Sequence, residues 1–169
     1  MANKTVDTLR KKTDAAWDNL SRQLQGMEPH LDRADAPGQW TTREVLCHLL
    51  AQPGSQTADL LKTFKDRDYR VVDFKPGEVN MTPDRKTMSL KRLVDALDAD
   101  RRGAYQYLDS LPEAELETRK LRIPIFKQFM GTEDVSLAMF AGAMFDYHWN
   151  DHAGQIGKIR KSAGLPEAR

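Results

Sequence analysis

Apolar side chains at alternating steps of three and four residues mark the first part of this chain as helical. Steps of this size place side chains on one face of an α-helix. The residues concerned are Val6, Leu9, Thr13, Ala16 or Trp17, Leu20, Leu24 and Met27. The pattern predicts a helix from about Lys4 to about Met27, with one face packed against other helices of a bundle.

A second helix is predicted to begin at Thr41, where Thr-Thr-Arg-Glu has the form of a capping box. In this motif the Thr41 hydroxyl accepts a hydrogen bond from the Glu44 amide, and the Glu44 carboxylate accepts one from the Thr41 amide. Apolar residues continue past Pro53 to Phe64. Because proline removes a helical hydrogen bond and clashes with the preceding turn, we expect a continuous helix with a kink near Gln52.

Two further helices are predicted in the second half of the chain. One runs from about Met88 to Leu111, and the last runs from about Thr132 to Ala163, where Gly164 supplies a stop. Polar side chains at Asp100 and Arg101 interrupt the apolar face of the third helix. Either the helix turns outward at this point, or a polar group there lines a cavity.

Two segments lack a sustained period. Residues Lys65–Thr87 contain prolines and many charges, which predicts a long connection that crosses the bundle. Residues Pro112–Gly131 are expected to form an irregular or short extended excursion over one end. We therefore predict an all-α fold, a four-helix bundle with a long crossover connection between helices 2 and 3. A single domain is expected over residues 1–169.

The charge pattern argues against several classes of partner. The chain carries 26 basic and 25 acidic residues, mixed along its length, for a net charge of +1. Nucleic acids and membrane surfaces bind clustered basic patches, so neither partner is expected, and a small-molecule substrate fits better. The first residues lack the apolar core of a signal peptide, and no apolar stretch reaches bilayer-spanning length. This predicts a soluble cytoplasmic protein.

Three histidines have the positions that a metal site requires. His148 and His152 are four residues apart in the predicted last helix, which places both imidazoles on one face about one turn apart. His48, on the second helix, can complete a facial set. A lone helical histidine is more often a structural residue, so the argument depends on the spacing of His148 and His152 together with the family resemblance described next. The sequence between the pair reads HWNDH, without the glutamate of the His-Glu-x-x-His metalloproteases, which excludes a peptidase of that type.

The stretches GQWTTREVLCHLL and DYHWNDHAGQIGKIR resemble the two signature regions of the DinB-like superfamily, which includes bacterial thiol-dependent transferases. The matching positions are Trp40, Thr41, His48, His148, His152, Gly154, Gln155 and Ile156. The resemblance implies a divalent cation, zinc or nickel, held by the three histidines with coordination positions left open. It also implies a homodimer.

Other residues near these histidines have alternative interpretations. Cys47, the only cysteine, lies about 100° around the helix from His48 and is predicted to be a small core residue outside the site. Asp151 either accepts a hydrogen bond from a histidine or is solvated, and we favour the solvated state. Trp40 is expected to pack across the start of the second helix rather than to bind substrate. Gln155 is expected to hydrogen-bond within the bundle, with a polar role near the pocket as the alternative.

Two aromatic residues flank His148 in the sequence. Tyr147 and Trp149 are expected to point away from His148, into core or dimer contacts.

The leading functional hypothesis is a metal-dependent transferase or hydrolase, in which the cation activates a thiol or water toward a small electrophile. The thiol would be a low-molecular-weight one. The sequence identifies no catalytic residue beyond the metal ligands. The alternative is a non-catalytic helical dimer, stress-related or ligand-binding, whose metal site is vestigial or empty.

Overall fold

The computed structural model describes residues 3–168. Helices dominate, and the strands form a single two-stranded antiparallel sheet within the described residues. The helices are α1 (Lys4–Leu24), η1 (Glu28–His30), α2 (Thr42–Leu49), α3 (Thr57–Leu61), α4 (Pro83–Thr87), α5 (Leu90–Asp109), α6 (Glu113–Thr118), α7 (Phe126–Met130), α8 (Leu137–Gly142), the π-helical η2 (Ala143–Tyr147) and α9 (His148–Ser162). The strands are β1 (Lys120–Arg122) and β2 (Asp134–Ser136).

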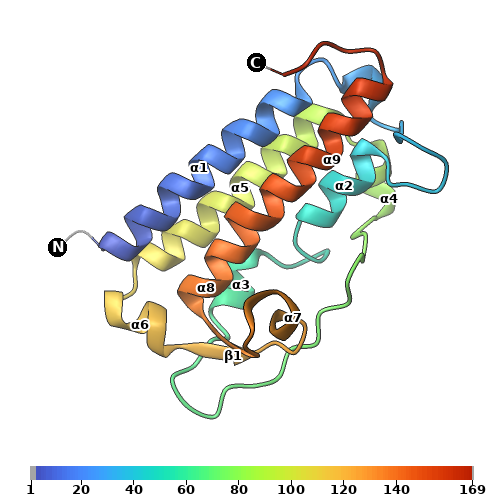
Figure 1. The fold of residues 1–169 in the computed structure, drawn as a ribbon. Helices are drawn as coiled ribbons and strands as arrows, with labels where there is room; N and C mark the ends of the chain where they lie inside the picture. The colour runs from blue at the N-terminus through green and yellow to red at the C-terminus, as the bar shows by residue number, and fades with distance from the viewer. Residues whose placement is uncertain (1–2, 169) are drawn as a thin grey trace.

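Four helical rods make a bundle, as predicted (Figure 1). The first is α1, the second is α2 continued by α3, the third is α5, and the fourth is α8, η2 and α9 in succession. Helix α1 packs against both α5 and α9, while α2 packs against α5 and α9. The crossover connection carries the chain from α3 at one end back to α4 at the other, so that α2 and α5 run in the same direction. None of the described helices is both long enough and apolar enough to cross a bilayer.

The first helix follows its sequence pattern closely. The Asn3 side chain caps it by accepting a hydrogen bond from the Val6 amide. Its buried face is the predicted one, formed by Val6, Thr13, Ala16, Leu20 and Leu24. Met27, also predicted on this face, is buried just beyond the helix end.

The prediction of a continuous kinked second helix is wrong. Helix α2 ends at Leu49, and an irregular stretch separates it from α3. Gly54 adopts a positive φ of 79°, a conformation that no α-helix can contain, and Pro53 before it cannot donate a helical hydrogen bond. The proline therefore breaks the helix into two.

Asp100, one of the two polar residues that interrupt the apolar face of the third helix, holds the beginning of α3. Its carboxylate accepts hydrogen bonds from the Thr57 amide at 2.8 Å and the Thr57 hydroxyl at 2.5 Å. Arg101 forms ion pairs with Asp14 and Asp98. Each side chain therefore has a polar partner on another helix, Thr57 on α3 for Asp100 and Asp14 on α1 for Arg101.

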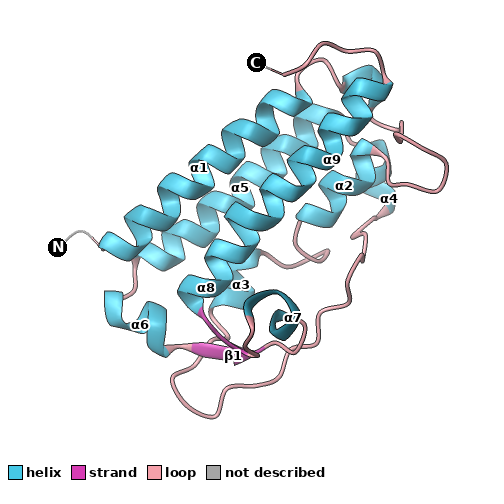
Figure 2. Ribbon diagram, viewed as in Figure 1, coloured by secondary structure: helices cyan, strands magenta, loops and turns pink. Residues whose placement is uncertain are grey.

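The segment after α5 is more regular than predicted. Strand β1 confirms the short extended element, and it pairs with β2 across one end of the bundle (Figure 2). Helices α6 and α7, and helix α4 in the crossover connection, were not predicted because each spans only five or six residues. The last rod also begins later than expected, at Leu137, since Asp134–Ser136 belong to β2.

The last rod contains a π-turn that its buried residues require. They include a series at successive steps of four, formed by Leu137, Ala141, Phe145, Trp149 and Ala153. Four such steps cover 16 residues, whereas four turns of α-helix hold about 14.4. The π-helical segment η2 takes up the excess and keeps both halves of the rod facing the core. The predicted face ran from Val135 through Ala138 or Met139 and Gly142 to Phe145. Val135 and Phe145 are buried as predicted, but the predicted positions between them are only half-buried, so that part of the predicted face is wrong.

Candidate metal centre

The capping box predicted at the start of α2 is present, and it fixes the helix that carries His48. The Glu44 amide donates to the Thr41 hydroxyl at 3.2 Å, and the Thr41 amide donates to the Glu44 carboxylate at 2.7 Å. His48 lies in the last turn of this helix, and its Nδ1 is 2.7 Å from the Glu78 backbone carbonyl. Because a carbonyl only accepts, this contact places the proton on Nδ1 and leaves an electron pair on Nε2.

His152, on α9, has its proton fixed in the same way. Its Nδ1 lies 2.8 Å from the side-chain oxygen of Gln155, one turn further along the helix. The amide oxygen accepts, so Nδ1 carries the proton and Nε2 presents an electron pair. This contact decides between the two expectations for Gln155: the amide acts at the histidine cluster.

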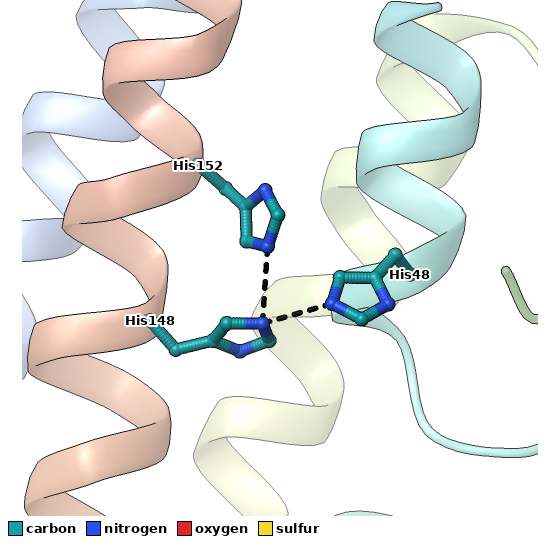
Figure 3. Close-up of side chains that lie close together, drawn as sticks. All are labelled: His48, His148 and His152. Carbon is teal, nitrogen blue, oxygen red and sulfur yellow. Dashed lines mark hydrogen bonds between the residues drawn. The ribbon is translucent and has the colours of Figure 1, made fainter. Parts of the chain in front are cut away.

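The three imidazoles meet between α2 and α9, as Figure 3 shows. Nε2 of His148 lies 2.9 Å from Nε2 of His48 and 3.1 Å from Nε2 of His152. The ligand atoms of the three residues all lie within 4.8 Å of one another. Nitrogens bound at about 2.0–2.1 Å to one ion lie about 3 Å apart, so the two distances from His148 match those of a metal site.

His148 occupies the centre of the cluster and is the first residue of α9. Its backbone amide donates to the Ala143 carbonyl five residues back, so the π-turn directly precedes it. Its Nδ1 is buried and has no hydrogen-bond partner among residues 3–168. The ring of His148 can therefore carry its proton on Nδ1, which leaves Nε2 as the third electron-pair donor.

The surroundings of the cluster disfavour protonated histidine. The pKa of His148 is lowered from 6.5 to about 3, mainly by burial and to a smaller extent by the nearby imidazoles of His152 and His48. Burial also lowers the pKa of His152, against the opposing effect of its hydrogen bond to Gln155. Neutral imidazole is the form that binds a cation, so the cluster is prepared for one at neutral pH.

Comparison with known proteins places this fold and cluster in a family. The model of the DinB superfamily matches residues 6–156, which include all three histidines. The chain belongs to the DinB superfamily. Among solved structures it is similar to YfiT from Bacillus subtilis, described as "a probable metal-dependent hydrolase with an unusual four-helix bundle topology". The similarity has a TM-score of 0.73 at 17% identity, and covers 98% of this chain and 91% of YfiT. No curated protein matches the chain.

In this DinB-superfamily chain the predicted histidines come together, and the residues predicted to lie outside the cluster do so. Cys47 is buried in the core, with its Sγ 3.8 Å from the Met81 sulfur, and burial raises the pKa of its thiol. Asp151 is exposed, in agreement with the solvated state favoured from the sequence. Tyr147 is exposed, and the Trp149 ring packs in the core. No fourth histidine, cysteine or acidic residue joins the cluster within the described chain.

Two contacts of the cluster were not predicted from the sequence of this DinB-superfamily protein. One is the Glu78 carbonyl, a backbone group that leaves no signal in residue type. The other is the Trp40 indole, which packs against the core and also lies against the rings of His48 and His152. The capping box gave Trp40 its place just before α2, but the direction of its ring depends on tertiary packing.

Proposed function

We propose that this protein is a divalent-metal-dependent enzyme in which His48, His148 and His152 hold the ion. The observation that carries the proposal is the convergence of three Nε2 atoms, two of them with electron pairs fixed by hydrogen bonds to Nδ1. Three imidazoles leave coordination positions open, as in catalytic zinc sites. Zinc and nickel are the proposed ions, since both bind imidazole well.

Hydrolysis of a small molecule is the reaction that we propose first. An ion at this position would act as a Lewis acid and lower the pKa of a bound water or thiol. The description of YfiT as a probable metal-dependent hydrolase supports this choice. Transfer to a low-molecular-weight thiol, suggested by the resemblance to thiol-dependent transferases, is the second candidate. The protein's part is to lower the pKa of His148 and His152, which keeps them neutral, and to orient all three rings.

Metal content tests the proposal directly. Protein purified without an affinity tag, or reloaded with zinc or nickel after chelation, should contain about one ion per chain by elemental analysis. The double variant His148→Ala, His152→Ala should contain none. His30→Ala is the matched control, since His30 is outside the cluster, and it should keep the ion. A parent protein that retains no ion even after reloading would disprove the proposal.

Activity assays then separate the candidate reactions. Loaded and metal-stripped protein are compared on ester, amide and phosphoester substrates, with and without small thiols. Metal-dependent cleavage in water alone supports the hydrolase, and turnover that requires a thiol supports the transferase. Stoichiometric metal without turnover in either assay favours the non-catalytic helical module.

A further inference from the structure

Trp40 contacts two of the three histidines at once. It lies directly before Thr41, the N-cap residue of α2. Its ring centroid is 4.8 Å from that of His48, with the rings tilted at 51°. The centroid of His152 lies 5.9 Å away, with the two rings nearly parallel at 16°. One indole thus bridges the ligand from α2 and a ligand from α9.

The crossover connection packs against the same indole. Gly77 has a positive φ of 72°, and a Cβ atom at this position would lie 3.7 Å from Cζ2 of Trp40. The next residue, Glu78, provides the carbonyl that binds His48. The backbone of residues 77 and 78 therefore contacts the cluster in two ways: Gly77 lies against the Trp40 indole, and the Glu78 carbonyl binds His48.

Hydrogen bonds tie this part of the connection to the end of α2. Asn80 donates from its side chain to the Leu50 carbonyl at 2.7 Å. The Arg85 guanidinium donates to the carbonyls of Asn80 and Ala51, at 2.6 and 2.9 Å. The segment that supports Trp40 is therefore anchored at several points close to His48.

These contacts have consequences for the orientation of the ligands. A hydrogen bond to Nδ1 fixes the proton of an imidazole, but the ring can still tilt about that bond. Packing against the face of a ring removes this freedom, and preoriented ligands bind a metal more tightly. The indole is also apolar, so it excludes water from its side of the cluster.

We propose that Trp40 is a positioning residue of the metal centre, which holds the rings of His48 and His152 in their ligating orientation and closes one side of the site. The inference rests on the metal-binding function proposed above. It also implies that substrate reaches the ion from a side away from the indole.

Metal affinity tests this inference without an activity assay. Zinc binding to chelator-treated protein is measured by calorimetric titration for the parent, Trp40→Leu, Trp40→Phe and the control Trp17→Phe. Trp17 packs on Trp149 in the core and makes no ring contact with the histidines. We expect affinity to fall about 10-fold in Trp40→Leu and less in Trp40→Phe, which keeps an aromatic face, and to be unchanged in Trp17→Phe.

Indole fluorescence gives a second readout. Nickel quenches a nearby indole, so titration should quench the parent and Trp17→Phe strongly and Trp40→Phe weakly. Parent affinity in both Trp40 variants, or equal quenching in Trp40→Phe, would overturn the inference while leaving the metal site intact. A parent that binds no ion would overturn the proposed function and this inference with it. If Trp40→Leu fails to fold, as judged by circular dichroism, Trp40→Phe decides the matter by both readouts.

Discussion

Each end of α2 has a polar side chain at the edge of the core. The two side chains differ in whether their nitrogen atoms are satisfied by hydrogen bonds within the fold. At the start, Arg43 is only 9% exposed, and each of its guanidinium nitrogens has an acceptor. Nε and Nη2 donate to the Asp32 carboxylate at 2.5 and 3.0 Å, and Nη1 donates to the carbonyls of Arg85 and Met88 at 3.1 and 2.5 Å. At the other end, His48 directs its Nε2 at another imidazole nitrogen.

The difference separates a structural polar group from a functional one. Buried polar groups that serve the fold are paired within the fold, because an unpaired one costs about 1–3 kcal/mol. The Arg43 cluster is complete in itself. The histidine cluster brings several hydrogen-bond acceptors together around one point and has no donor of its own to satisfy them, so a cation would complete it under the proposed function. Each prediction below tests this contrast, from the largest expected effect to the smallest.

Acid should destabilise the metal-free protein through the histidine cluster. The pKa of His148 falls from 6.5 to about 3 on folding, and that of His152 is also lowered, so the folded chain binds fewer protons than the unfolded chain. The contribution to stability is therefore full above pH 6.5 and is lost as the pH decreases toward 3. Urea unfolding with chelator present, at a series of pH values, measures the loss.

The double variant His148→Leu, His152→Leu is the reference for this pH series. The lowered pKa of Asp32, held down by its hydrogen bond to Arg43, contributes an acid-sensitive term to both proteins equally. The double variant should therefore lose less stability than the parent between pH 6.5 and 4. Identical pH profiles would show that the cluster does not resist protonation.

Replacing Arg43 should weaken the fold and leave metal binding unchanged. Arg43→Leu removes the donors that satisfy the Arg85 and Met88 carbonyls, and the expected loss is about 2–3 kcal/mol in the free energy of unfolding. Urea unfolding measures this loss, and calorimetric titration with zinc measures the affinity. Arg92→Leu, at an exposed position on α5, is the control and should change neither quantity. A weakened affinity in folded Arg43→Leu would mean that the two ends of α2 are coupled.

Replacing Gln155 should have the reverse effect. Gln155→Leu removes the acceptor that holds the proton of His152 on Nδ1, so in the metal-free protein the proton can move to Nε2, where the His148 Nε2 lies 3.1 Å away and can accept it. Zinc affinity should therefore fall about 10-fold while the free energy of unfolding changes little. Gln155→Glu keeps an acceptor in the same place and should restore affinity. Equal losses in both variants would indicate that side-chain shape, rather than the hydrogen bond, matters at this position.

The histidine cluster could be predicted from the sequence because two of its three members are related by a spacing within a single helix. A spacing of four residues places His148 and His152 on one face of any helix, whatever surrounds them. The capping box likewise fixed the start of α2 from four adjacent residues. The spacing does not show that α2 lies beside α9, which brings His48 to the other two histidines. The resemblance to the DinB-like superfamily predicted that arrangement.

The contacts that complete the site depend on tertiary structure and could not be predicted in this way. The Glu78 carbonyl is 30 residues from His48 along the chain, and every residue has a carbonyl. The break after α2 illustrates a different limit, since the proline signal was present but was interpreted as a kink. The π-turn had a sequence signal too, the repeated steps of four from Leu137 to Ala153, which the alternating pattern of three and four obscured.

The smallest predicted effect concerns the break that follows the site. Asp100 caps α3 through its two hydrogen bonds from Thr57, and it belongs to the class of completed structural groups, like Arg43. Asp100→Ala should lower the free energy of unfolding by about 1 kcal/mol, the usual cost of a lost cap, with no change in zinc affinity. Asp35→Ala, in an exposed loop, is the control.

The Asp100 variant is informative because α3 begins only nine residues after His48. If zinc affinity falls together with stability, the irregular stretch between α2 and α3 transmits disorder to the last turn of α2. Metal binding would then depend on how that stretch is held. If stability falls alone, the end of α2 is held by what touches it directly, the Glu78 carbonyl and the hydrogen bonds from Asn80 and Arg85. We expect the second result, since those bonds anchor Leu50 and Ala51 before the chain reaches Pro53.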